Sequence, residues 1–126
     1  ALRQLGKLEK FNAHRKKISD FYAKELKESK FSVPKGEGIF MRYPLIADID
    51  ADKLLNDLKR KSIVLNDGWR RSVVVPLGTD LNKMNYIPGS CPVAEKMAEK
   101  IVNLPTHITL SEENAKEIID LLKSWK

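Results

Sequence analysis

The spacing of apolar residues along the chain predicts four helices. Residues 51–61 and 92–102 place apolar side chains on one face and charged side chains on the other. Both are expected to be core helices, the first through Leu54, Leu55 and Leu58. A last helix follows Ser111. Residues 1–28 are predicted as a long leading helix, because one apolar stripe runs through Leu5, Leu8, Phe11, Ile18, Phe21, Tyr22 and Leu26.

Short polar side chains mark where these helices begin. Asp50 and Ser111 precede two of them and are strong N-cap residues, since their oxygens accept a bond from a free first-turn N–H. Ser90 or Cys91 can cap the third helix, and Pro92 suits its first position because its missing N–H costs nothing there. Residues 103–105, Asn-Leu-Pro, are expected to end that helix.

Four short segments are expected as strands: residues 39–47, 63–65, 73–75 and 106–109. Pro44 lies inside the first of them. Because proline cannot donate to a sheet ladder, it predicts an edge strand or a bulge there.

The order of these elements favours an α+β fold over a doubly wound sheet. Several connections are short, and short connections join antiparallel neighbours more readily than parallel ones. We therefore expect residues 1–126 to form a single domain, with a small, mainly antiparallel sheet of about three to four strands packed against about four helices.

The composition is that of a soluble globular protein, with 42% hydrophobic residues. No apolar run approaches the roughly 20 residues of a membrane span, and the first residues do not resemble a signal peptide. Cys91 is the single cysteine, which predicts a reducing, cytoplasmic location. His14 and His107 are the two histidines, so no metal site is predicted. The chain begins at Ala1 and enters helical periodicity at once, which suggests a piece of something longer.

The net charge of +6 comes mostly from the leading helix, since residues 1–30 hold nine Lys or Arg and four Asp or Glu. Its centre carries the basic run His14-Arg15-Lys16-Lys17. One interpretation is a solvated helix face. The other is a contact to phosphate or nucleic acid, which would make the chain a basic nucleic-acid-binding module.

The most ligand-like cluster is Trp69-Arg70-Arg71. Arginine offers planar, bidentate recognition of carboxylate or phosphate, and tryptophan offers a stacking face, so these three residues are predicted to bind substrate. The alternative is a tryptophan that plugs the core with the arginines at its rim. The sequence holds no phosphate-binding glycine loop and no nucleophile motif, and we assign no catalytic residue to it.

The segment from Gly89 to His107, GSCPVAEKMAEKIVNLPTH, resembles the end of the DegT/DnrJ/StrS aminotransferases, whose pattern here is a Cys-Pro-x-Ala-Glu sequence, a helix, and then a Leu-Pro pair followed by histidine. The residues in those positions are Cys91, Pro92, Ala94, Glu95, Leu104, Pro105 and His107. Earlier matches, in order, are Gln4-Leu5-Gly6-Lys7-Leu8, Arg15, Tyr22, Leu26, Arg42-Tyr43-Pro44, the helix around Leu54–Leu58, and Ile63.

This resemblance implies the C-terminal small domain of an aminotransferase that uses pyridoxal 5′-phosphate (PLP). Many such enzymes are homodimers that aminate nucleotide-linked keto sugars. The Schiff-base lysine and the phosphate cup of the family lie in the large domain, so no cofactor-binding residue is carried over. Arg70 and Arg71 depart from the family pattern, in which a histidine–aromatic or Trp-Tyr pair stands near the substrate. A non-catalytic interaction domain derived from the same fold is a further alternative.

Overall fold

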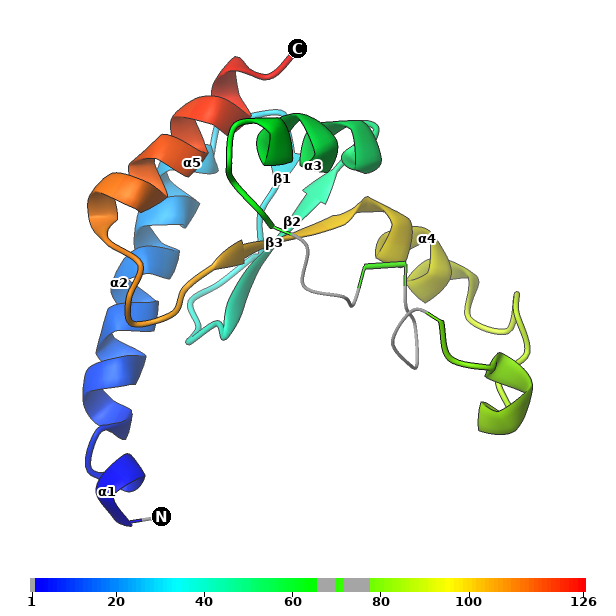
Figure 1. Cartoon of the computed structure of the whole chain (residues 1–126), viewed down its shortest axis with the longest axis horizontal. Helices are drawn as coiled ribbons and strands as arrows, with labels where there is room; N and C mark the ends of the chain where they lie inside the picture. Colours follow the sequence, from blue (N-terminus) through cyan, green and yellow to red (C-terminus); the bar gives the residue numbers. More distant parts are fainter. Residues whose placement is uncertain (1, 66–69, 72–77) are drawn as a thin grey trace. The chain divides into compact units, whose positions relative to one another are not determined.

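The computed structural model describes residues 2–65, 70–71 and 78–126 (Figure 1). Its helices in these ranges are α1 (Leu2–Leu5), α2 (Leu8–Leu26), α3 (Ala51–Arg60), α4 (Pro92–Lys100) and α5 (Glu112–Ser124), with a 3-10 turn η1 (Leu81–Met84). The strands are β1 (Phe31–Ser32), β2 (Arg42–Ala47) and β3 (Ile101–Pro105).

The three strands form one antiparallel sheet in the order β1-β2-β3, which confirms the predicted α+β class. Pro44 therefore lies in the central strand and not at an edge. The reason is the length of β1: with two residues it can pair with only a short part of the six-residue β2. Among the described residues, most of that side of β2 thus has no strand partner, and a proline is tolerated where no ladder partner needs its N–H.

Contacts within the chain group it into two compact units. Unit 1 contains Ala1–Leu45 and Leu104–Lys126, and unit 2 contains Ile46–Asn103. That the two act as a single domain over residues 1–126 stays a prediction.

In unit 1, α2 and α5 pack side by side (Figure 1). The predicted cap of α5 is confirmed, because the Ser111 side chain accepts a hydrogen bond from the Asn114 N–H at 3.1 Å. Each helix buries part of its apolar stripe. The buried apolar residues of the two helices are Ile18, Tyr22, Leu26, Ala115, Ile118, Ile119 and Leu122.

Aromatic residues join α2 to the strands of this unit. Tyr22 and Tyr43 are both buried, with ring centroids 5.5 Å apart, and Phe40 meets Tyr43 edge-on at 5.3 Å. The Tyr22 hydroxyl donates to the Pro105 carbonyl at 3.1 Å. The buried Thr106 hydroxyl lies 2.7 Å from the carbonyl oxygens of residues 40 and 41. These contacts fix the end of β3 against α2.

In unit 2, α3 begins as predicted. The Asp50 side chain accepts a hydrogen bond from the Lys53 N–H at 3.0 Å, and Ala51, Leu54 and Leu58 are buried. By contrast, α4 buries one residue, Ala98.

The prediction that α4 is a core helix is therefore wrong for the described part of the chain. Val93 and Met97 lie one turn apart, with 76% and 38% of their surface exposed. Apolar spacing specifies which side chains share a helix face, and whether that face is covered depends on the surrounding chain.

The leading helix is interrupted, where the sequence predicts one continuous helix over residues 1–28. α1 ends at Leu5, Gly6 and Lys7 form a turn, and α2 begins at Leu8. Glycine in a helix interior costs about 1 kcal/mol relative to alanine. The Leu2, Leu5 and Leu8 side chains are exposed, so packing does not offset this cost. The helix therefore breaks at its weakest position.

Three strand predictions and one helix end need correction, and the fourth strand prediction lies on residues 73–75, outside the described residues. The strand expected over residues 39–47 begins only at Arg42. Residues 101–102 belong to β3 and not to the preceding helix, because their β-branched side chains favour a strand and burial alternates along it. Residues 106–109 are not a strand: residues 108–109 form a turn closed by the Leu110 N–H, which donates to the His107 carbonyl, and the Thr106 hydroxyl donates to backbone carbonyls. Residues 63–65 have no strand assignment, although Leu65 is buried.

Candidate functional site

Arg70 is held between two helices of unit 2. Its Nη1 donates to Asp52 Oδ1 in the first turn of α3, and its Nη2 donates to the Glu99 carbonyl at 2.9 Å in the last turn of α4. Only 12% of its side chain is exposed, and Nε is buried without a hydrogen-bond partner among the described residues. Arg70 thus satisfies a carbonyl that the helix end would otherwise leave open.

Arg71 shares the same carboxylate. Its Nη2 pairs with Asp52 Oδ2, and its backbone N–H donates to the Ala98 carbonyl at 2.9 Å. The φ angle of Arg71 is +61°, a left-handed conformation that costs about 1–2 kcal/mol for a residue with a Cβ. That conformation places both arginines on the C-terminal end of α4. With 54% of its side chain exposed, Arg71 is the outer member of the pair.

A hollow of about 290 Å³ adjoins these groups. One wall is α3, and residues 64–65 and 70–71 form the other. The lining residues are Asp52, Leu55, Asn56, Lys59, Val64, Leu65, Arg70 and Arg71. Leu55, predicted to face the core, is half-buried and lines this hollow instead.

The structure thus brings Arg70 and Arg71 together, and Trp69 lies outside the described residues. Sequence reasoning missed Asp52, the carboxylate that joins the two arginines. The signal available was its place in the first turn of a helix, where an acidic residue also complements the helix dipole. Because acidic residues are common in the first turn of a helix, the position of Asp52 did not indicate its long-range ion pairs with the two arginines.

A second polar constellation joins η1 and its loop to α4. The Glu95 carboxylate accepts from the Tyr86 hydroxyl at 2.6 Å and from the Gly89 N–H at 2.7 Å. The hydrogen bond from Tyr86, followed by that from Gly89, lowers the pKa of Glu95. The same carboxylate raises the pKa of Tyr86 to about 12. The Glu of the Cys-Pro-x-Ala-Glu motif therefore anchors the preceding loop.

The N-terminus of α4 is not capped by a side chain. Cys91 occupies the N-cap position but makes no side-chain cap bond, and it is exposed. Pro92 stands at the first helical position as predicted. The side-chain cap that the sequence allows at Cys91 is thus absent.

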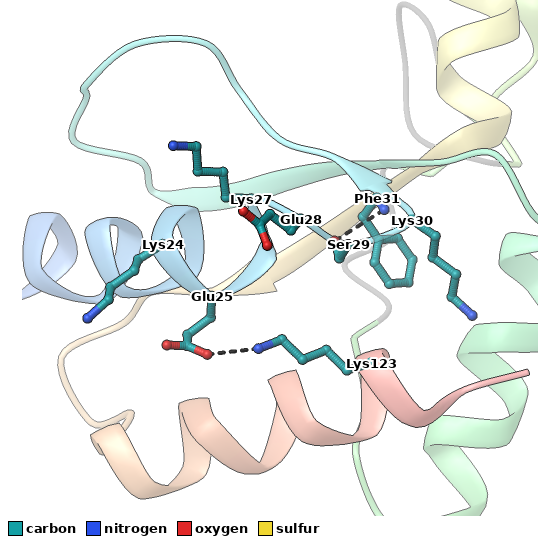
Figure 2. Close-up of a pocket in the computed structure, with 8 residues that line it drawn as sticks. All are labelled: Lys24, Glu25, Lys27, Glu28, Ser29, Lys30, Phe31 and Lys123. Atoms are coloured by element: carbon teal, nitrogen blue, oxygen red, sulfur yellow. Dashed lines mark hydrogen bonds and ion pairs between the residues drawn. The ribbon is translucent and has the colours of Figure 1, made fainter.

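A larger hollow of about 670 Å³ lies in unit 1, where α2 ends beside β1 and the last turn of α5 (Figure 2). Lysines dominate its lining, but several are already engaged. Lys123 pairs with Glu25 at 2.8 Å, and Lys30 donates to the Trp125 carbonyl and lies 4.7 Å from the Trp125 ring centroid. Lysines at helix C-termini also complement the helix dipole. Two of the four lysines in the described lining are thus engaged in contacts within unit 1.

The basic run of the leading helix is used within the fold. His14 Nε2 lies 3.0 Å from the His107 carbonyl, Lys16 pairs with Asp20 and Glu37, and Lys17 pairs with a glutamate of α5. The hydrogen bonds that Lys16 donates to Asp20, and then to Glu37, raise its pKa. These contacts favour the structural interpretation of the run over a nucleic-acid contact.

Neither metal ligation nor a membrane span is indicated in the described ranges. His107 is bound through Nδ1 to the Thr109 hydroxyl at 2.8 Å, and no group of three or more His, Cys, Asp or Glu that could hold a metal ion occurs among the described residues. In the same part of the chain, no helix is both long and apolar enough to cross a membrane.

Comparison with known proteins identifies the family. The model of the DegT/DnrJ/EryC1/StrS aminotransferase family matches residues 1–123. The chain belongs to this family. No match was found among curated proteins.

Solved structures share the fold of this chain. A DegT DnrJ EryC1 StrS aminotransferase from Brucella abortus is 27% identical, with a TM-score of 0.71 over 96% of this chain and 32% of its own. DesV from S. venezuelae, solved with a ketimine intermediate, is 20% identical, with a TM-score of 0.77 over 96% of this chain and 33% of its own. The sugar aminotransferase CalS13 from Micromonospora echinospora is 20% identical, with a TM-score of 0.77 over 98% of this chain and 33% of its own. The chain thus spans about a third of the length of these enzymes.

Proposed function

We propose that this chain is the C-terminal small domain of a PLP-dependent aminotransferase that acts on a nucleotide-linked keto sugar. The observation that carries the proposal is the family match over residues 1–123. In support, solved neighbours that include sugar aminotransferases superpose on nearly the whole chain while extending to about three times its length. The whole enzyme is proposed to be a cytoplasmic homodimer, with a large domain as the partner of this one.

PLP is assigned to the large domain because the described residues do not fit a site for it. PLP acts as an electron sink for amino-group transfer once a lysine holds it as a Schiff base. Such a lysine belongs in an enclosed pocket, and the buried residues of the described ranges include no lysine. Lys16 and Lys123, for example, are ion-paired on the surface. We therefore derive no step of the transfer from these side chains.

The role that we assign to this domain is recognition of the substrate. Trp69, Arg70 and Arg71 are proposed to face the substrate, with the arginines supplying positive charge. The contacts of Arg70 to α3 and α4 support a rigid placement of that charge, since both ends of its guanidinium are held. The partial exposure of Arg71 supports access from solvent.

The test is an assay of a polypeptide that joins this chain to a large domain. We expect bound PLP, seen as absorbance in the visible range, and transfer of the amino group of L-glutamate or another amino acid to a nucleotide-linked keto sugar, followed by mass spectrometry of the product. Bound PLP without transfer to any keto sugar would contradict the substrate class. Failure to bind PLP would favour the non-catalytic interaction domain.

A second measurement separates the roles of the two parts. The 126-residue chain alone is mixed with PLP and then passed through a desalting column. We expect the cofactor to be lost, because its lysine is assigned to the large domain. A stable coloured complex of this chain with PLP would contradict that assignment.

A further inference from the structure

The hollow beside α3 has an uneven charge. Among its described lining residues, Asp52 is the one acidic side chain, and Lys59, Arg70 and Arg71 are basic. The lysine-lined hollow of unit 1 has the same net charge, with four lysines and two glutamates in its described lining. The α3 hollow differs because its two arginines share a single carboxylate, so positive charge remains in excess around Asp52.

The two arginines differ in how firmly they hold Asp52. Arg70 is largely buried and also binds the Glu99 carbonyl, so it cannot turn away without leaving that carbonyl open. Arg71 is half exposed, and its guanidinium meets Asp52 through Nη2. An arginine presents five N–H donors in a planar fork, and the Arg71–Asp52 contact uses one terminal nitrogen of that fork. The ion pair between Arg71 and Asp52 is therefore the contact that a ligand can replace.

The Asp52 carboxylate shows which ligand chemistry suits the place. Its two oxygens bridge two guanidinium groups, Oδ1 to Arg70 and Oδ2 to Arg71. Carboxylate and phosphate groups have oxygens spaced to accept from arginine in this way. Since 42% of the Asp52 side chain is exposed, an oxyanion from solvent can reach the same donors.

We propose that this hollow is an oxyanion site for a phosphate or carboxylate group of a small molecule, in which Arg71 and Lys59 bind the oxyanion and Asp52 is its internal competitor. In the ligand-free state Asp52 holds Arg71, and a bound oxyanion takes the place of Asp52 on Arg71 while Arg70 keeps its bonds to Asp52 and Glu99. Identifying the oxyanion with part of the aminotransferase substrate rests on the function proposed above. The site itself does not depend on it.

The experiment titrates the 126-residue chain with inorganic phosphate, and in a parallel arm with acetate, at constant ionic strength. Binding is followed by NMR through the Nε–Hε signals of the arginines and the side-chain amide of Asn56. We expect saturable shifts at Arg71 and Asn56. A stronger response to phosphate would identify a phosphate group as the ligand, and a stronger response to acetate a carboxylate group.

Three variants decide the assignment. Asp52→Asn removes the competitor and is expected to tighten binding about fivefold, the size of one exposed ion pair. Lys59→Gln is expected to weaken binding by a similar factor. Lys27→Gln, in the hollow of unit 1, changes the net charge equally and is the matched control. Its affinity is expected to equal that of the unmodified chain.

Opposite results would overturn the proposal. If Asp52 only supports the local fold, Asp52→Asn disorders Arg71 and binding weakens or stays unchanged. If the chain binds anions only through its general positive charge, Lys27→Gln and Lys59→Gln weaken binding equally. Arg71→Gln keeps the backbone bond to the Ala98 carbonyl and removes the proposed ligand side chain, so it is expected to weaken binding as well. The titration contains neither PLP nor an amino donor, so a failed titration would overturn this site without contradicting the proposed aminotransferase function. An enzyme assay without activity would in turn not contradict this site.

Discussion

Tyr22 and Tyr43 offer a sharp test of the core of unit 1, because they are alike in burial and opposite in hydrogen bonding. Their rings contact each other, and both side chains are fully buried. The Tyr22 hydroxyl donates to the Pro105 carbonyl at 3.1 Å. The Tyr43 hydroxyl is buried without a partner among the described residues. The same substitution to phenylalanine should therefore have opposite effects.

The magnitudes follow from the cost of unpaired polar groups. Tyr22→Phe removes one hydrogen bond and is expected to lower the free energy of unfolding by about 1 kcal/mol. The Tyr43 hydroxyl loses its hydrogen bonds to water on folding and gains none among the described residues. Tyr43→Phe removes this hydroxyl and is expected to raise the free energy of unfolding by up to about 1 kcal/mol. Both variants keep the ring contact, so the difference between them, about 2 kcal/mol, isolates the hydroxyl groups.

The measurement is urea unfolding of the two variants and the unmodified chain, followed by far-UV circular dichroism. A change of 1 kcal/mol corresponds to a shift of about 3–5 °C in Tm for a chain of this size, so thermal unfolding gives an independent check. Equal slopes of the urea transitions would show that the unfolded states are comparable. If Tyr43→Phe destabilises the chain as much as Tyr22→Phe, the reasoning from hydroxyl pairing is refuted.

Three further predictions concern pH and the leading helix. Burial raises the pKa of Tyr22 above the ordinary value of 10.0, so the neutral Tyr22 side chain stabilises the fold below about pH 10, and this stabilisation is lost as pH rises further. The free energy of unfolding, measured between pH 9 and 12, should therefore fall less steeply in Tyr22→Phe than in the unmodified chain. The hydrogen bond from Tyr86 is the main cause that lowers the pKa of Glu95 from 4.5, so the NMR shift of the Gly89 amide should titrate with a midpoint below pH 4.5. Tyr86→Phe should move that midpoint upward, and an unmoved midpoint would contradict the assigned cause. Gly6→Ala should join α1 to α2, because the added Cβ meets only the carbonyl oxygens of residues 2 and 3, at 3.8 Å and 3.9 Å, and helix propensity improves by about 1 kcal/mol; unchanged ellipticity at 222 nm would argue against this.

The sequence was a reliable guide where one residue determines local geometry. Asp50 and Ser111 begin helices as predicted, since an N-cap needs only its own oxygen and a nearby N–H. The α+β class followed from the mixture of short strands and helices. These predictions depend on interactions over a few residues.

The errors arose where the outcome depends on distant parts of the chain. Ile101 and Val102 fit both the helical face of α4 and the alternation of a strand, and pairing within the sheet decided for the strand. β1, with two residues, was missed because so short a strand has no periodicity to detect. Its existence depends on β2.

The candidate site shows the same limit. The chemistry of Arg70 and Arg71 was visible in the sequence, and their common partner Asp52 was not. The left-handed conformation of Arg71 could not be foreseen either, because it is stabilised by a bond to Ala98 that only the folded chain provides. Residue type thus indicated the kind of ligand, and the fold determined how the donors are arranged.

The direct passage from α4 into β3 restricts how this segment can change in evolution. Lys100 ends the helix, Ile101 begins the strand, and the Ile101 N–H still donates to the Met97 carbonyl. With no loop between them, inserting one residue would move every later side chain of β3 to the opposite face of the sheet. Insertions and deletions should therefore be rare at Lys100–Ile101 among homologous sequences, and frequent in the exposed loop around Asp80.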